Sequence, residues 1–307
     1  MVSRRSILKG LGAASASLLI PVSIKAGTVK KYSSANIRYC LNTSTISGQG
    51  LDLRQIIEVT AKAGYDGIEL WVDDVKKYLT EGKTLASLKK HIDDSRLVVE
   101  NAIGFAQWIV DDDQTRKAAF EQMETEMKMM AELGCKRIAA PPAGATSGKL
   151  LDLTIVAQRY RALIELGLRT GVMPQLEIWG SSLNLSRLSQ ALYVATEANY
   201  PQARILTDIY HMYRGGSGFD GLNVLHGTAY EIFHMNDYPS TPEREQLTDA
   251  DRVFPGDGVA PMSQIASYLL HSGGTKVLSL ELFNRSYWKR DALEVAIEGL
   301  KKMKKFI

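Results

Sequence analysis

One repeated pattern decides the fold, and residues 175–208 contain a complete copy of it: QLEIWGSSLNLSRLSQALYVATEANYPQARILTD. An apolar run at Gln175–Trp179 precedes a segment at Leu185–Ala198 whose apolar residues recur every three or four positions. A second apolar run follows at Arg204–Asp208. These periods predict strand, helix and strand, and two strands joined by a helix lie parallel in one sheet.

The same alternation continues from residue 37 to the C-terminus. Further helices are predicted at Leu53–Ala63, Gln114–Leu133, Ile155–Thr170 and Asp291–Met303. The predicted strands number eight: Ile37–Asn42, Gly67–Trp71, Leu97–Ile103, Arg137–Ala140, Gln175–Trp179, Arg204–Asp208, Ile232–Asn236 and Val277–Phe283. Eight strand–helix units over about 270 residues match a single (β/α)8 TIM barrel that fills residues 37–307.

The alternation of strands and helices is also compatible with an open, doubly wound sheet, which is the alternative to the barrel. Such folds often carry a Gly-x-Gly-x-x-Gly turn after the first strand, and the sequence after Asn42 has none. The run Gly215-Gly216-Ser217-Gly218 comes after the sixth strand, where a flexible active-site loop is the better interpretation. The pattern therefore favours the barrel.

Composition and charge exclude several classes of protein. The 307-residue chain is 45% hydrophobic and 23% charged, which is enough to bury a full core. Its formal charge of +3 depends on four basic residues in the first 26, a segment without acids: Arg4, Arg5, Lys9 and Lys25. Without them, 33 basic residues face 34 acidic ones. A nearly neutral protein has no electrostatic reason to bind nucleic acid or an anionic membrane.

The N-terminus resembles an export signal. Ser3-Arg4-Arg5-Ser6-Ile7-Leu8-Lys9 is similar to the twin-arginine motif, and the weakly apolar stretch Gly10–Ile24 follows it. That stretch is too short and too rich in small residues to span a membrane stably. We expect a signal peptide at residues 1–26, a linker at 27–36 and a periplasmic mature protein. A disordered basic tail is the alternative.

Acids and a histidine close the last four predicted strands, at the end where such barrels build their active sites. An isolated acid in an apolar strand is costly to bury unless it is paired with a cation. One divalent metal ion would serve all four side chains, which are Glu177, Asp208, His234 and Glu281. Three carboxylates suit Mn²⁺ or Mg²⁺ and tolerate Co²⁺ or Zn²⁺. The alternative is that each acid pairs with a nearby lysine or arginine.

These four residues and two further motifs resemble the xylose isomerase-like barrel superfamily. The motifs are Gly64-Tyr65-Asp66-Gly67-Ile68-Glu69-Leu70 and Asp251-Arg252-Val253-Phe254-Pro255-Gly256-Asp257-Gly258. That group of sugar isomerases and epimerases includes ketose 3-epimerases, hydroxypyruvate isomerase and inosose dehydratase. The resemblance spans about residues 37–305, and it specifies the superfamily without specifying the substrate.

The resemblance implies a role for each matching residue. The four strand-end side chains would bind the metal, while His211 and Arg252 would hold substrate oxygens. Glu177 and Glu281 would also act as opposed acid and base on a carbon next to a metal-bound carbonyl. The implied activity is isomerisation or epimerisation of a sugar through an enediolate. For His211, the alternative is a hydrogen bond that supports a metal ligand.

Further substrate contacts are expected from Glu69 and from aromatic side chains. We expect two or three aromatics to line the pocket, Trp179 among them, and the rest to belong to the core. The candidates at or just past the predicted strand ends are Trp71, Phe105, Trp108, Trp179, Tyr210 and Phe283.

Some positions depart from the family pattern. Where many family epimerases carry another acid after the fifth-strand glutamate, this chain has Ser181, Ser182 and Leu183. Asn42 and Asn101 stand in strands where several relatives have a basic residue. The substrate of the well-known members is therefore not implied.

Three other functions share features of this sequence pattern. Apurinic endonucleases share the barrel but hold three zinc ions with extra histidines; here the second and third strands have no histidine, and Val253 replaces one after the seventh. A dehydratase of a keto-sugar or keto-inositol stays open, because an enediolate can expel hydroxide. So does a noncatalytic sugar-binding barrel. We expect a free keto-sugar or inositol derivative as the small-molecule partner, and the pattern leaves room for a homo-oligomer.

Overall fold

The computed structural model describes residues 36–307, and the strands in that range form a closed parallel barrel. Neighbours in the barrel follow the order of the chain, and β1 pairs with both β2 and β8. The strands are β1 Asn36–Asn42, β2 Gly67–Trp71, β3 Val98–Ile103, β4 Arg137–Ala140, β5 Met173–Glu177, β6 Ile205–Asp208, β7 Ile232–Met235 and β8 Thr275–Leu280. The predicted TIM barrel is confirmed.

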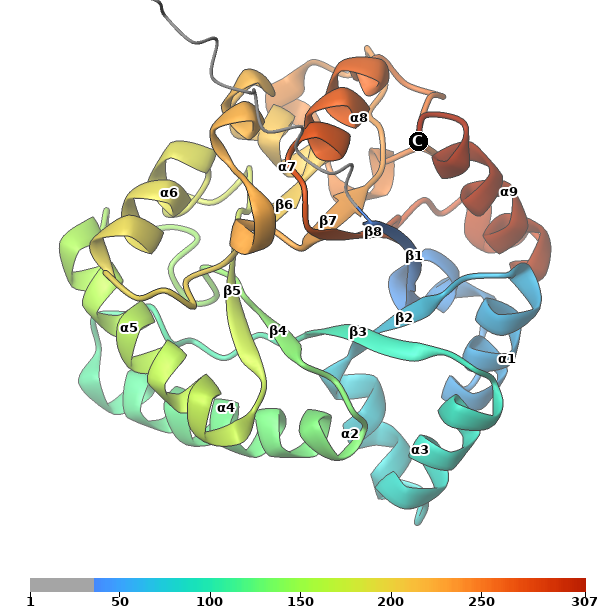
Figure 1. Cartoon of the computed structure of the whole chain (residues 1–307), viewed down its shortest axis with the longest axis horizontal. Coiled ribbons are helices and arrows are strands. Elements are labelled where there is room, and N and C mark those ends of the chain that lie inside the picture. The colour runs from blue at the N-terminus through green and yellow to red at the C-terminus, as the bar shows by residue number, and fades with distance from the viewer. Residues whose placement is uncertain (1–35) are drawn as a thin grey trace, which may run out of the picture. The chain divides into compact units, whose positions relative to one another are not determined.

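Helices surround the strands on the outside of the barrel (Figure 1). They are α1 Leu53–Ala63, α2 Val72–Thr80, α3 Leu85–Asp94, α4 Asp113–Glu132, α5 Leu153–Thr170, α6 Leu188–Glu197, α7 Ile209–Arg214, α8 Met262–His271 and α9 Ala292–Lys304. Local chemistry sets several of their ends. The Asp52 and Asp291 carboxylates accept backbone N–H bonds as N-caps of α1 and α9. Gly64 ends α1 with φ 89°, a conformation that favours glycine.

The predicted strands differ from the observed ones mainly at their ends. β5 stops at Glu177 and β8 at Leu280, so the predicted strands reached too far towards Trp179 and Phe283. Both aromatics therefore lie in loops beyond the strands, where the backbone is free to turn them towards the barrel mouth. Glu281 is the first residue after β8.

An apolar floor inside the barrel supports the polar mouth. The buried side chains that form it are Cys40, Ile103, Ala139, Leu206, Ile232 and Val277. Successive inward positions of a strand are two residues apart. Asp208 and His234 therefore lie one layer above Leu206 and Ile232. A larger apolar core fills the space between strands and helices.

The expected signal peptide, and the linker up to residue 35, lie outside the described residues. Within residues 36–307, no helix has both the length and the apolar character that crossing a membrane requires.

Candidate active site

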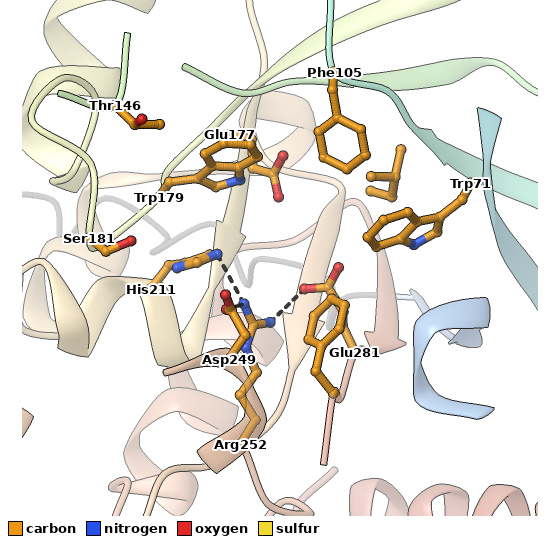
Figure 2. A pocket seen from close by; sticks show the side chains of 12 residues that line it. Trp71, Phe105, Thr146, Glu177, Trp179, Ser181, His211, Asp249, Arg252 and Glu281 are labelled. Carbon is orange, nitrogen blue, oxygen red and sulfur yellow. Dashed lines mark hydrogen bonds and ion pairs between the residues drawn. The ribbon is translucent and has the colours of Figure 1, made fainter. Parts of the chain in front are cut away.

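A cavity of about 470 Å³ opens at the C-terminal ends of the strands. Figure 2 shows Trp71 and Phe105 on one side, His211 and Arg252 on the other, and the Glu177 and Glu281 carboxylates between them. The remaining lining residues are Ile103, Thr146, Trp179, Ser181, Asp249 and Phe283. Aromatic rings and charged side chains thus line the cavity together, with two acids among them.

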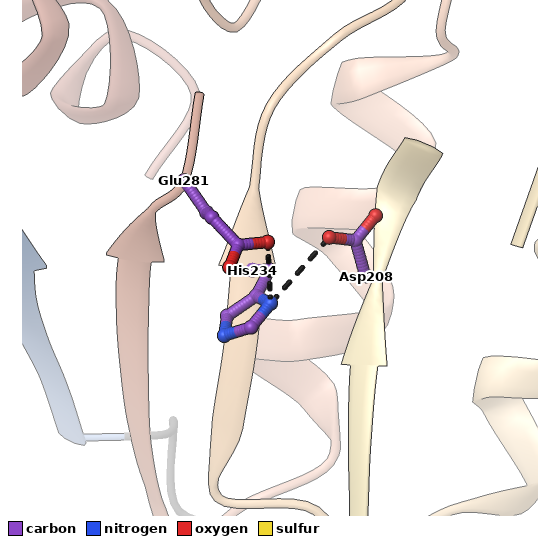
Figure 3. Close-up of side chains that lie close together, drawn as sticks. All are labelled: Asp208, His234 and Glu281. Carbon is purple, nitrogen blue, oxygen red and sulfur yellow. Dashed lines mark ion pairs between the residues drawn. The ribbon is translucent and has the colours of Figure 1, made fainter. Parts of the chain in front are cut away.

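Three buried side chains at this end of the barrel, of which Glu281 also lines the cavity, are close enough to share one ion. The possible ligand atoms of Asp208, His234 and Glu281 all lie within 4.8 Å of one another. His234 Nδ1 is 3.0 Å from Glu281 Oε2 and 3.5 Å from Asp208 Oδ2 (Figure 3). The three come from adjacent strands, with Asp208 in register with His234 across β6 and β7. The barrel itself therefore assembles this cluster.

Glu69 sets the orientation of the His234 ring. Its Oε1 lies 3.1 Å from His234 Nε2, and the carboxylate also accepts from Asn42, Asn101 and Ser279. Burial raises the pKa of Glu69, but His234 and these donors outweigh it and leave the pKa below its ordinary value. An ionised Glu69 accepts a hydrogen bond from Nε2–H, so Nδ1 faces Asp208 and Glu281.

His234 Nδ1 faces two carboxylates, so a positive charge between these atoms would stabilise the cluster. Burial lowers the pKa of His234, but the charges of Glu281 and Glu69 raise it by more, so the pKa lies well above its ordinary value. Either a second proton on the ring or a metal ion would supply that charge. His234 Nδ1 and Glu177 Oε2 are both buried without a hydrogen-bond partner in the described part of the chain. Two such atoms beside two more carboxylates fit a divalent cation.

Glu177 reaches the cavity from the end of β5. It is not part of the tight three-residue cluster, although it is buried and lines the cavity. Burial raises the pKa of Glu177 most; His234 lowers it, while Glu281 and Asp208 raise it again, to about 8. A cation beside this carboxyl would favour its ionised form. Glu177 is thus suited either to bind metal or to carry a proton.

Arg252 provides the fixed positive charge of the site. Its Nη1 donates to Glu281 Oε2 at 2.6 Å and to Asp208 Oδ2 at 3.1 Å. Its guanidinium lies over the rings of Tyr210 and Phe283. Burial lowers the pKa of Arg252, but the surrounding carboxylates raise it above its ordinary value. The alternative to a metal site was that each acid pairs with a lysine or arginine. Asp208 and Glu281 do pair with Arg252, but Glu177 has no such partner within residues 36–307.

The loop after β7 holds Arg252 in place. The Asp237 carboxylate accepts backbone N–H bonds from Gly256, Gly258 and Ala260 at 2.9–3.1 Å. A side chain at Gly258 would collide with Asp237 and with the Tyr238 carbonyl, since a Cβ there would lie 2.2 Å from that oxygen. Gly256 and Gly258 therefore allow the loop backbone to approach the Asp237 carboxylate closely.

His211 is positioned by Asp208, which caps α7. Asp208 Oδ1 accepts the His211 backbone N–H at 2.7 Å, while Oδ2 points to the cluster and accepts from Arg252 and Asn236. The ring accepts the Gly180 N–H at Nδ1 and lies 3.0 Å from Arg252 Nη2 at Nε2. Burial lowers the pKa of His211 and Arg252 lowers it further; although Asp208 raises it, it stays below the ordinary value. A neutral ring has one lone pair for these two donors.

The sequence profile of the family described as "Xylose isomerase-like TIM barrel" matches residues 57–306. The chain belongs to this family. It is 28% identical to the inosose isomerase of Bacillus velezensis over 84% of this chain and 92% of that protein. It is 23% identical to the 3-dehydroshikimate dehydratase of Pseudomonas putida over 85% of this chain and 40% of that protein. A crystal structure of IolI with a bound zinc atom matches with TM-score 0.79 and 24% identity, over 88% and 99% of the two chains.

Four aromatic residues line the cavity of this xylose isomerase-like barrel, more than the two or three expected. Trp71 contacts Phe105 and Phe283, and Phe105 contacts Trp179, with ring centroids 5.2–6.0 Å apart. Trp108 instead belongs to the core, where its Nε1 donates to the Pro141 carbonyl. The aromatic side chains that line the cavity thus form a continuous wall.

Two sequence-based expectations differ from the structure of this family member. Glu69, an expected substrate contact, is fully buried and absent from the cavity lining, because its carboxylate is occupied by His234 and three other donors. The glycine-rich run 215–218 does not line the cavity either. Ser217 Oγ instead accepts the Leu188 N–H at the start of α6.

Asn42 and Asp249 are site residues that the sequence analysis missed. Asn42 Nδ2 donates to Glu69 and to Glu281, while Asn42 Oδ1 accepts from Trp71 Nε1. Asp249 accepts from Arg252 and lines the cavity. Asn42 closes an apolar strand just as Asp208 does, so its position carried a signal. Asp249 begins a short 3-10 helix after β7, away from any strand end, and its position carried no such signal.

Proposed function

We propose that this protein is a divalent-metal-dependent isomerase or epimerase of a sugar-like ketone. The observation that carries the proposal is that two buried acids, Glu177 and Glu281, face one cavity beside Asp208 and His234. The similarity to an inosose isomerase supports this activity. The IolI structure, which has the same fold, contains a bound zinc atom, and this supports a metal ion in the present protein.

Glu177, Asp208, His234 and Glu281 would hold the ion. When bound, the metal would polarise a substrate carbonyl and acidify the neighbouring C–H. A carboxylate-rich set favours Mn²⁺ or Mg²⁺, and Zn²⁺ is the alternative. Metal analysis of the purified protein, followed by titration of the metal-free form with each ion, decides the identity.

Proton transfer falls to the two glutamates. Glu177 enters from β5 and Glu281 from the end of β8, with β6 and β7 between them. One carboxylate would take the proton from the carbon beside the carbonyl, and the other would return a proton to the opposite face. In the metal-free protein the pKa of Glu177 is about 8, and a bound cation would lower that pKa and favour the carboxylate that takes a proton.

His211 and Arg252 would hold the substrate oxygen on which negative charge develops. The Gly180 N–H and the Arg252 guanidinium both point a donor at the His211 ring, and a neutral ring can accept only one of the two hydrogen bonds. An oxygen placed between them would accept from Nε2–H and from the guanidinium together, which removes that conflict. The pair is thus better suited to a bound oxygen than to its own contact.

A neutral ring ketone fits the cavity better than an anion. Among its described lining residues, Arg252 is the only lysine or arginine, and Asp208, Asp249 and Glu281 already pair with it. Apart from the proposed metal ion, a substrate phosphate or carboxylate would find no cationic side chain that is not already paired. The aromatic wall suits the apolar face of a ring. We therefore propose a free keto-sugar or keto-inositol.

Proton exchange in deuterated water tests the reaction. The metal-loaded protein is incubated with a panel of neutral keto-sugars and keto-inositols, and products are followed by NMR. Deuterium at a sugar carbon with an isomeric product supports the proposal. Loss of water instead identifies a dehydratase, the second candidate, which the Pseudomonas putida relative and the proton-holding Glu177 favour. Binding without either reaction identifies a noncatalytic barrel.

Export by the twin-arginine route to the periplasm, and assembly into a homo-oligomer, belong to the same proposal. The motif at Arg4 and Arg5 supports export. Mass spectrometry of the periplasmic fraction is expected to find a chain that begins near residue 27, and an intact Met1 there would contradict it. Size-exclusion chromatography with light scattering tests the oligomer.

A further inference from the structure

A second cavity, of about 200 Å³, lies at the opposite end of the barrel. Its lining residues come from the N-terminal ends of β4 to β7, whereas the candidate active site lies at the C-terminal ends. They include Lys136, Arg137, Gln175, Gln202, Arg204 and Glu231. We propose that this cavity binds a small oxyanion that also carries a hydroxyl group, with hydrogen phosphate as the best match.

Positive charge is in excess around this cavity. Arg137 is neutralised, because its Nε donates to Glu231 at 2.8 Å and its Nη1 lies 3.4 Å from Glu100, which also pairs with Arg38. Those four charges cancel. Arg204 donates from Nη1 only to the carbonyls of Pro201 and Ala203. Lys136 has no ion pair within residues 36–307. Two positive charges are therefore left without a counter-charge.

Gln175 forms the buried part of the cavity. It is only 1% exposed, and neither its Nε2 nor its Oε1 has a hydrogen-bond partner in the described structure. The Gln202 Oε1 is likewise buried and unpartnered. Buried amide groups are normally satisfied, so their partner should come from whatever fills the cavity. The ligand must therefore both accept and donate hydrogen bonds.

The need for a ligand that both accepts and donates hydrogen bonds restricts the possible anions. Sulfate and chloride only accept, whereas hydrogen phosphate accepts through its charged oxygens and donates through one hydroxyl. A small hydroxycarboxylate shares that chemistry. The charged oxygens would pair with Arg204 and Lys136 and accept from Gln175 Nε2, while the hydroxyl would donate to an amide oxygen. Since one water occupies about 30 Å³, the cavity can hold such an anion with a few waters.

The test measures binding to the metal-free full chain by calorimetry at low ionic strength, with inorganic phosphate, L-malate and sulfate as separate ligands. Absence of the active-site metal keeps phosphate from binding there. We expect saturable binding of phosphate or malate with a Kd of about 1 mM or below, and sulfate several-fold weaker. The stronger of the first two ligands identifies the natural class.

Three variants locate the binding. Arg204→Gln and Gln175→Leu should each weaken it about tenfold or more, because each removes a bond to a charged oxygen. Lys136→Gln changes an exposed side chain that the fold does not need, and it should weaken binding several-fold. Lys149→Gln removes the same charge from the loop between β4 and α5 and should change nothing. Thermal unfolding checks that each variant is folded.

Either of two results overturns the proposal. One is the absence of saturable binding up to about 20 mM ligand, which would mean that water alone fills the cavity. The other is equal binding by the wild type and the Lys136→Gln and Arg204→Gln variants, or equal binding of sulfate and phosphate. Turnover of keto-sugars is measured separately, so failure here leaves the proposed activity untouched.

Discussion

Charged side chains gather at both ends of the barrel, but they are arranged differently at each end. At the N-terminal end, Arg38, Glu100, Arg137 and Glu231 alternate in sign, and each charge touches its opposite. At the C-terminal end, several acids surround one histidine, and a single arginine neutralises part of the set. Buried charge by itself therefore does not mark an active site. A cavity surrounded by an excess of negative charge does, because a bound cation would complete such a set.

The largest expected effect is on turnover, and it distinguishes the acids at the C-terminal end of the barrel from those at the N-terminal end. Glu177→Gln and Glu281→Gln should each lower kcat about a thousandfold or more, because the amide cannot transfer the proton. The matched change Glu100→Gln should leave kcat/KM within about twofold while it destabilises the fold by about 3 kcal/mol. Steady-state kinetics and thermal unfolding measure the two. Normal turnover by Glu177→Gln would disprove the two-carboxylate mechanism.

The next effect concerns metal affinity. Glu69→Gln should weaken metal binding about 10- to 100-fold, because an amide no longer holds the His234 ring with Nδ1 towards the ligands. Glu126→Gln is the matched control, since Glu126 is a buried glutamate paired with Lys76 away from the cluster. Calorimetric titration of the metal-free proteins measures both. If the two variants lose metal affinity equally, the effect is one of general destabilisation.

A smaller effect is expected on substrate binding. His211→Ala removes one of the two donors proposed for the substrate oxygen, so KM should rise about tenfold. Metal content should stay near that of the wild type, because His211 lies outside the cluster of Asp208, His234 and Glu281. Kinetics combined with metal analysis distinguishes the roles. Loss of the metal in this variant would assign His211 to the ligand set instead.

The smallest effect is on the pH dependence of stability. The folded metal-free protein holds the Glu177 proton up to about pH 8, whereas the unfolded chain releases it near the ordinary value of 4.5. The resulting stabilisation is complete below pH 4.5 and is lost as the pH rises towards 8.

Glu177→Gln removes this titration. It should therefore raise the Tm of the metal-free protein at pH 8 by about 3–6 °C relative to wild type, with a smaller gain at pH 5. Scanning calorimetry at both values measures the difference. An equal gain at pH 5 and pH 8 would show that the Glu177 charge is not its cause.

Much of the fold could be predicted because its signals are local. The amphipathic period of Leu53–Ala63, with Asp52 before it and Gly64 after it, specifies that helix without any distant contact. The strand-end acids could be predicted for a related reason: parallel strands of a barrel bring all their C-terminal ends to one mouth. Predictions were poorer where a residue lies past a strand end. Trp179 and Phe283 are examples, since loops follow no period.

The amino-acid pattern alone was enough to predict eight strands and to bring Glu177, Asp208, His234 and Glu281 to the same mouth. What each of these side chains touches depends on how the barrel is assembled. Asn42 bonds to Glu281, 239 residues away, because closure of the barrel places β1 beside β8. Glu69 faces His234 across the barrel interior and does not reach the cavity. Such contacts depend on register and side-chain direction between distant strands, which no local pattern encodes.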